Sequence, residues 1–217
     1  MAAIHKASIF TYCLIISALL GAVIIIFWTE QARFLLPTPK PDQHYEVAFG
    51  ERPDLSAAGI ELKNGVNLLH FYNPDCPCSR FNLRHFQSLL KAYNQQVGFY
   101  IVTQAPTDVF DEEAAAGELK VLVDQSGEIA DLCGVYATPQ AVVLDQQGSI
   151  IYRGNYNRAR FCTSRDSWFT QMVLDSELGQ GQPVQLSQEA FVPYGCNLPS
   201  DQYTASGLMD VIRQLMN

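Results

Sequence analysis

Positive charge is scarce in this 217-residue sequence, which has 14 Lys and Arg residues against 22 Asp and Glu residues. Without Lys6, Glu30 and Arg33, which flank an apolar N-terminal segment, the remaining chain has 12 basic and 21 acidic residues, a net charge of about −9. This excess of negative charge argues against nucleic acid and against anionic lipid surfaces as partners. Internal repeats and low-complexity tracts are also missing, and the length suits a membrane anchor plus one domain.

Charge is absent altogether from residues 9–28. At ~1.5 Å per residue, a helix of this length spans the ~30 Å hydrocarbon core of a bilayer. A cleaved signal peptide is the alternative, but its apolar region is usually only ~7–15 residues long. This run also ends in Phe27-Trp28-Thr29-Glu30, a poor cleavage site. The sequence therefore predicts a transmembrane helix.

The segments around this helix predict the topology of the chain. The short flank 1–8 favours a cytoplasmic N-terminus, which in a bacterium places the following domain in the periplasm and the anchor in the inner membrane. Residues 29–41 form a Pro-rich linker that is stiff and extended. The domain is expected at 42–217, with a C-terminal extension from about residue 180.

Apolar periodicity predicts an α/β domain. The expected strands are 66–72, 97–102, 119–123, 140–144 and 149–153. The expected helices are 79–93, 108–117, 128–133, 164–178 and 205–216. This order predicts a mixed central sheet flanked by helices on both faces.

Two cysteines one residue apart, Cys76 and Cys78, lie between the first strand and the first helix of the domain. A thiol at a helix N-terminus is near the positive end of the helix dipole, which favours the thiolate. The thiolate attacks disulfides, reduces peroxides and binds metals. We therefore interpret Cys76 as a nucleophile and Cys78 as the partner that resolves a mixed disulfide. A Cys76–Cys78 bridge would close a small, strained ring.

Three pieces of the sequence, in the right order, resemble the thioredoxin-like superfamily. The run 66–72 leading into Cys76 is similar to its first core strand and active-site cysteine. The run 121–130 is similar to the insertion of its redoxin branch, which includes membrane-anchored periplasmic thiol oxidoreductases and peroxiredoxins. The run 134–139, followed by 141–145, is similar to its cis-proline loop and hairpin. The segments around Cys162 and Cys196 resemble a little-characterised bacterial group of the superfamily.

The resemblance implies a substrate-binding site for an extended protein segment. Thr138 and Pro139 would form the cis-Pro pair that packs against the nucleophile. A substrate can bind there by pairing as an added strand. Pro77 is the third candidate substrate-binding residue. The sequence departs from the family in three places. The cysteines are one residue apart instead of two, Asn73 replaces the peroxiredoxin Thr, and His70 replaces a buried carboxylate. His70 is a candidate proton store or base, or a core histidine without chemistry.

Five cysteines in the domain are an odd number, so at least one is unpaired in a fully paired monomer. Cys162 and Cys196 are candidates for a structural disulfide that ties down the C-terminal tail, or one of them is a distal resolving cysteine. Cys133 is expected to be a buried free thiol.

The predicted function is a membrane-tethered thiol–disulfide oxidoreductase that acts on protein thiols or disulfides, as a monomer and without a cofactor or resident metal. A peroxide-reducing redoxin, a copper-binding thioredoxin-like chaperone and a redox-inactive interaction domain are the alternatives.

Overall fold

The structure is a computed structural model that describes residues 2–41, 44–56, 60–159, 161, 163–181 and 184–198. The chain divides into two compact units, Met1–Leu36 and Pro37–Asn217. The first unit holds helix α1 (Ala2–Glu30) and the short 3-10 helix η1 (Ala32–Leu35). Within α1, the 21 residues Ile9–Thr29 have a mean hydropathy of 2.7, which is apolar enough to cross a membrane. A signal sequence would meet the same criterion.

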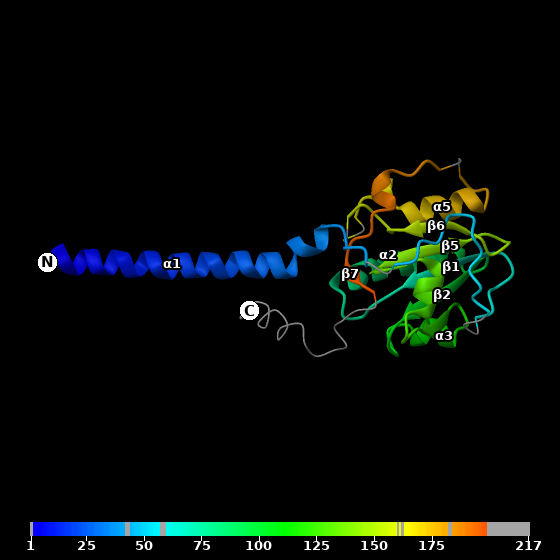
Figure 1. The fold of residues 1–217 in the computed structure, drawn as a ribbon, viewed down its shortest axis with the longest axis horizontal. Helices are drawn as coiled ribbons and strands as arrows, with labels where there is room; N and C mark the ends of the chain where they lie inside the picture. Colours follow the sequence, from blue (N-terminus) through cyan, green and yellow to red (C-terminus); the bar gives the residue numbers. More distant parts are fainter. Residues whose placement is uncertain are drawn as a thin grey trace. The chain divides into compact units, whose positions relative to one another are not determined.

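The second unit is built on a five-stranded sheet with the order β3-β2-β1-β5-β6 (Figure 1). Its strands are β1 (Val66–Phe71), β2 (Val97–Thr103), β3 (Lys120–Val123), β5 (Gln140–Leu144) and β6 (Ile150–Gly154). Strands β1, β2 and β3 are parallel, whereas β5 runs antiparallel to both β1 and β6. Every residue of β1 and β2 is buried, as expected for strands covered on both faces. The predicted mixed sheet is confirmed.

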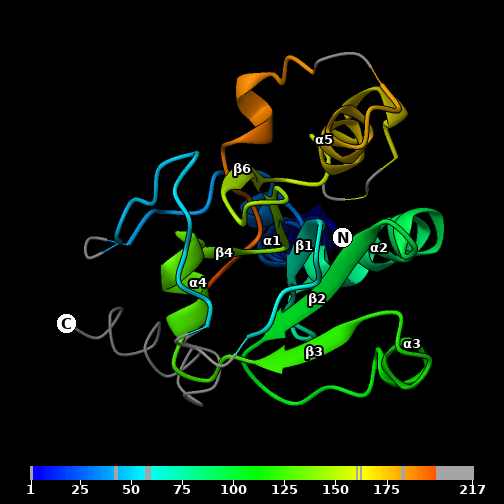
Figure 2. The same cartoon turned by 90° about the vertical axis from the view of Figure 1, so that its right-hand side faces the viewer.

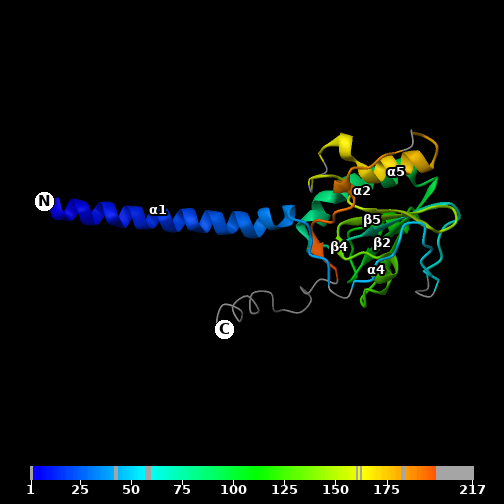
Figure 3. The same ribbon diagram turned by 45° about the horizontal axis from the view of Figure 1, so that its top comes forward.

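Helices cover both faces of this sheet. Helices α2 (Pro77–Tyr93) and α5 (Phe169–Glu177) lie on one face, and α4 (Glu128–Cys133) lies on the other, as Figures 2 and 3 show. Side chains of β1 alternate between the two sides. Leu68 packs in the cluster that includes Phe86 of α2, and Leu69 packs in the cluster that includes Ile129 of α4. Phe86 is fully buried, so replacing it with Ala should cost ~3–5 kcal/mol.

Most element boundaries lie close to the predicted ones. Helix α2 begins at Pro77 rather than at residue 79, because the fixed φ of proline suits the first position of a helix, which needs no N–H. The hairpin between β5 and β6 turns where the carboxylate of Asp145 accepts hydrogen bonds from two backbone N–H groups. The predicted helix at 164–178 is divided into the 3-10 helix η2 (Arg165–Ser167) and α5. Helix α3 (Asp111–Ala115) is shorter than predicted, and the helix predicted at 205–216 lies outside the described residues.

A second, two-stranded sheet was not predicted. Strand β4 (Ala137–Thr138) pairs antiparallel with β7 (Cys196–Asn197), so that Thr138 lies opposite Cys196. The chain reaches β7 after the 3-10 helix η3 (Gln188–Ala190). This pairing brings the C-terminal tail to the start of α2.

Candidate active site

Cys76 lies where β1 gives way to α2. It is the N-cap residue of the helix, has an extended backbone, and its side chain is fully buried. The first N–H groups of a helix have no intrahelical partners, and together with the helix dipole they stabilise a negative charge at this position. The site therefore favours a thiolate at Cys76 whenever the sulfur is not in a disulfide.

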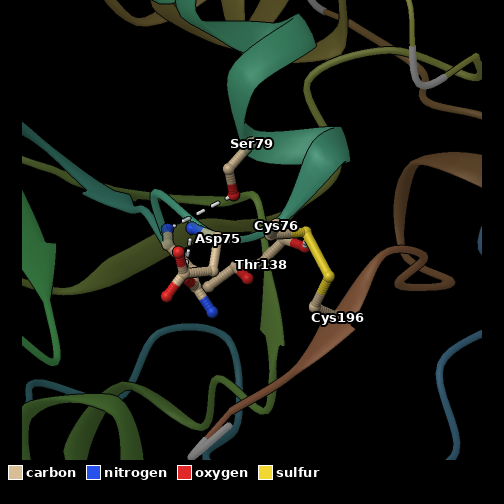
Figure 4. Close-up of a disulfide and its surroundings, with 6 residues drawn as sticks. Asp75, Cys76, Ser79, Thr138 and Cys196 are labelled. Atoms are coloured by element: carbon tan, nitrogen blue, oxygen red, sulfur yellow. Dashed lines mark hydrogen bonds between the residues drawn. A yellow bond between two sulfur atoms is a disulfide. The ribbon is translucent and has the colours of Figure 1, made fainter. Parts of the chain in front are cut away.

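Asn73 shapes the loop that presents Cys76. Its side-chain oxygen accepts a hydrogen bond from the backbone N–H of Asp75 at 2.9 Å, and its own N–H donates to the Ser79 hydroxyl at 3.3 Å (Figure 4). Its carbonyl accepts a bond from the N–H of Cys76 at 3.1 Å. Asn73 thus fixes the turn before the helix. The sequence marks this residue only as a position where the peroxiredoxin Thr is missing, so its role in the turn is a finding of the structure.

The loop that carries β4 contains a cis peptide bond between Thr138 and Pro139, as the resemblance implied. The carbonyl oxygen of Thr138 lies 3.4 Å from the sulfur of Cys76. Both residues of the pair are buried. In the thiol state, the S–H of Cys76 can donate to this carbonyl, which places the backbone of β4 directly beside the candidate nucleophile.

The sulfur of Cys76 is bonded to that of Cys196, 120 residues further along the chain (Figure 4). The two Cα atoms are 6.0 Å apart, which is an ordinary separation for a disulfide. The predicted structural pair of Cys162 and Cys196 is thereby corrected, since the structure gives Cys196 a different partner. Cys162 itself lies outside the described residues. Cys78 remains a buried thiol in the first turn of α2.

Cys196 is held in place by the segments on both sides of it. The N–H of Leu198 donates to the carbonyl of Tyr136 at 2.9 Å, and the hydroxyl of Tyr194 donates to the carbonyl of Asn157 at 2.8 Å. Gly195, with φ of +120°, passes so close to β4 that an added Cβ would overlap the carbonyl oxygen of Thr138. Only glycine fits this approach. The segment is therefore shaped to bring Cys196 to Cys76.

His70 lies on β1 and faces α2. Its ring stacks on Phe86 with a centroid separation of 4.5 Å and meets the edge of Tyr156 at 5.0 Å. Burial lowers the pKa of His70 to about 3, and the backbone of Gln140 offsets only part of this effect. The imidazole is therefore neutral at physiological pH, as a proton acceptor must be, but it is a weak base. Its catalytic role stays a prediction.

Cys133 is a buried thiol at the end of α4, as predicted. Burial raises its pKa to about 12, with Asp124 adding to the effect and Arg153 opposing it. It is therefore protonated and unreactive at neutral pH. Among the residues that the structure describes, no group of three or more His, Cys, Asp or Glu side chains could hold a metal ion.

Known proteins share both the sequence pattern and the fold of this domain. A family model described as Domain of unknown function (DUF6436) matches residues 47–197. The chain belongs to this family. The matched region contains the whole described site, from Cys76 to Cys196. A comparison with curated protein sequences gives no match.

Solved structures resemble this chain at low sequence identity. A hypothetical protein from Sinorhizobium meliloti 1021 is 19% identical, with a TM-score of 0.55, and the match covers 72% of this chain and 96% of that one. StoA from Bacillus subtilis is 23% identical with a TM-score of 0.34, over 42% and 73% of the two chains. A lipoprotein thioredoxin from Streptococcus pneumoniae strain TIGR4 is 17% identical with a TM-score of 0.39, over 54% and 86%. The mixed sheet with the order β3-β2-β1-β5-β6, the helices on both of its faces and the cis Thr138-Pro139 loop give this domain the thioredoxin-like fold that the sequence predicted.

Proposed function

We propose that this protein is a membrane-tethered thiol–disulfide oxidoreductase whose nucleophile is Cys76. The observation that carries the proposal is the disulfide of Cys76 at the start of α2, directly beside the backbone of Thr138. A sulfur in this position can form and break disulfides next to a backbone edge that binds an extended peptide. Thr138, whose carbonyl lies beside the sulfur, Pro139 and Pro77 are the proposed substrate-binding residues.

The exchange reaction needs no cofactor. The thiolate of Cys76 attacks one sulfur of a substrate disulfide, a mixed disulfide forms, and the other substrate sulfur leaves as a thiolate. A second thiol of this protein then attacks the sulfur of Cys76 and releases the remaining substrate cysteine. The net result is a reduced substrate and an oxidised enzyme, and the reverse sequence oxidises a substrate dithiol.

Two cysteines are candidates for the second thiol. Cys78, in the Cys76-Pro77-Cys78 motif, is the nearer in sequence, and Cys196 is the one bonded to Cys76 in the structure. His70, buried beneath α2 and neutral, is the candidate for proton storage during these steps. The peroxide and copper alternatives gain no comparable support from the described residues.

We further propose that α1 anchors the protein in the inner membrane of a bacterium, with the domain in the periplasm. The 21-residue apolar segment Ile9–Thr29 supports a single-pass anchor. An oxidising compartment also suits a protein that carries a disulfide. Protein thiols or disulfides outside the cytoplasm are then the substrates, and the protein acts as a monomer.

The test compares Cys76→Ser with the wild type as full-length proteins in detergent. The reduced proteins are mixed with a disulfide-containing peptide, and free thiols are blocked before mass spectrometry. We expect the wild type to form a mixed disulfide at Cys76, and the variant to lose at least about 100-fold in exchange rate. Cys13→Ser in α1 is the matched control and should exchange like the wild type. Exchange by Cys76→Ser at the wild-type rate would refute the proposal.

A further inference from the structure

Residues 195–198 lie where the proposed function places a substrate. They run antiparallel to β4, with Cys196 opposite Thr138 and the N–H of Leu198 bonded to the carbonyl of Tyr136. An extended peptide added to this edge would use these same backbone groups. The chain therefore fills its own peptide-binding edge, and a cysteine of that segment is bonded to the nucleophile.

Each position of the segment fits the edge in a different way. Gly195 comes so close to the Thr138 carbonyl that no larger residue fits without displacement. Cys196 reaches the nucleophile. Leu198 is 5% exposed and packs into the apolar cluster on the α4 side of the sheet. The edge thus selects for glycine before the cysteine and for an apolar residue two positions after it.

The chain just before this segment is fastened to the domain. The side-chain amide of Asn155 donates to the carbonyls of Glu189 and Val192, at 2.9 and 2.6 Å. The carbonyl of Pro193 accepts a bond from the N–H of Thr38 at 2.8 Å. A strand tethered this closely to its docking edge has a high effective concentration there. It can therefore displace a bound peptide without a high intrinsic affinity.

We propose that residues 195–198 are a built-in strand that resembles the substrate, and that Cys196 is the resolving cysteine. The substrate is a segment of the pattern Gly-Cys-x-apolar, and Cys196 replaces its cysteine in the disulfide with Cys76. The inference rests on the proposed function and adds the identity of the second thiol and the class of substrate sequence. Both strands need the same groups of β4, so they occupy the edge one at a time.

The exchange is balanced without a further reagent. In the mixed disulfide, the Cys196 thiolate attacks the sulfur of Cys76, the Cys76–Cys196 bond forms, and the substrate cysteine leaves as a thiolate. To restart the cycle, an external dithiol attacks the disulfide and leaves as its own disulfide, returning two thiols. Cys196 is partly exposed and Cys76 is fully buried, so the external thiol enters at Cys196 and the Cys76 thiolate leaves.

The test uses the full-length Cys196→Ser variant in detergent, reduced, and three synthetic peptides. The first has the sequence of residues 192–198, and the others carry Gly195→Ala or Leu198→Ser. Each peptide cysteine is activated as a mixed disulfide with thionitrobenzoate. Attack by Cys76 joins the peptide to the protein and releases coloured thionitrobenzoate, which gives the rate. A Cys76→Ser/Cys196→Ser protein supplies the blank for the other thiols.

We expect the unaltered peptide to react about ten times faster than the Gly195→Ala peptide and severalfold faster than the Leu198→Ser peptide. The protein's own tail, which carries the Cys196→Ser substitution, competes equally with all three peptides and leaves the ratios unchanged. Equal rates for the three peptides would overturn the inference. So would a Cys76 that reacts with dithiobis(nitrobenzoate) but with none of the peptides. A Cys76 inert to that small disulfide as well would overturn the proposed function itself.

Discussion

Two cysteines could share a disulfide with Cys76, and they belong to different regions of the molecule. Cys78 lies two residues further on in α2, whereas Cys196 comes from a strand 120 residues away and is the one that is bonded. Cys78 lies in the first turn of α2, is buried, and is not the cysteine bonded to Cys76. Cys196 lies on β7, which pairs with β4, and its Cα is 6.0 Å from the Cα of Cys76, an ordinary separation for a disulfide.

Nearness in sequence therefore does not decide which cysteine is bonded to Cys76. The helix side of the site supplies the electrostatics, because the N-terminus of α2 stabilises a thiolate. The tail side supplies the partner, because β7 is aligned with the edge beside the nucleophile. Substitutions that alter one side at a time separate the two contributions.

The largest expected effect comes from the tail side. Cys196→Ser removes a disulfide that closes a loop of 120 residues, so the free energy of unfolding should fall by about 2–4 kcal/mol. Urea denaturation with and without excess reductant measures this. In reductant, the wild type and the variant should be equally stable. A wild type that is unaffected by reductant would contradict the presence of this bond in solution.

On the helix side, pH should change stability through His70. The folded protein binds a proton there only near pH 3, whereas the unfolded chain does so near 6.5, so unfolding is favoured as the pH falls through this window. Between pH 7 and pH 5, His70 should account for a loss of about 2 kcal/mol. His85, whose pKa burial lowers to about 4, adds to the loss. His70→Phe should remove roughly half of their joint effect in urea titrations at the two pH values; an unchanged pH dependence would refute this assignment.

Gly195→Ala tests the fit of the tail strand with a single added methyl group. The clash with the Thr138 carbonyl should shift the Cys76–Cys196 equilibrium in a glutathione buffer towards the dithiol by about tenfold. Gly179→Ala, at another positive-φ glycine with open space around it, is the matched control for backbone strain. If the two variants shift the equilibrium equally, the close approach to β4 has no special effect.

Cys78→Ala should have the smallest effect on that equilibrium, about threefold or less, because the Cys76–Cys196 bond does not involve its sulfur. The same glutathione titration gives the answer. A large shift towards the oxidised Cys76–Cys196 form in this variant would show that a Cys76–Cys78 bridge normally competes with it.

The sequence predicted the helix side of the site, but for the tail side it left open only that Cys162 or Cys196 is a distal resolving cysteine, and it did not predict the pairing of β4 with β7. β1 and β5 are largely apolar runs of five or more residues and α2 has apolar periodicity, and the Cys76 and Thr138-Pro139 motifs lie at the ends of these elements. Strands β4 and β7 are two residues long, too short for any periodic signal. The pairing of Cys196 depends on a long-range approach that only the folded backbone reveals. One local signal was available. Gly195 directly precedes Cys196, and a glycine in such a position can mark a close approach of the backbone.

Disulfide mapping of the oxidised full-length protein decides whether Cys76 and Cys196 are bonded in solution. Trypsin separates the relevant cysteines into three peptides. Peptide 64–80 contains Cys76 and Cys78, peptide 161–165 contains Cys162, and peptide 166–213 contains Cys196. We expect peptide 64–80 to be linked to peptide 166–213 under non-reducing conditions in the wild type. The same link should form in Cys78→Ala and should be absent from Cys76→Ser. A link between 161–165 and 166–213, or a bridge confined to 64–80, would contradict it.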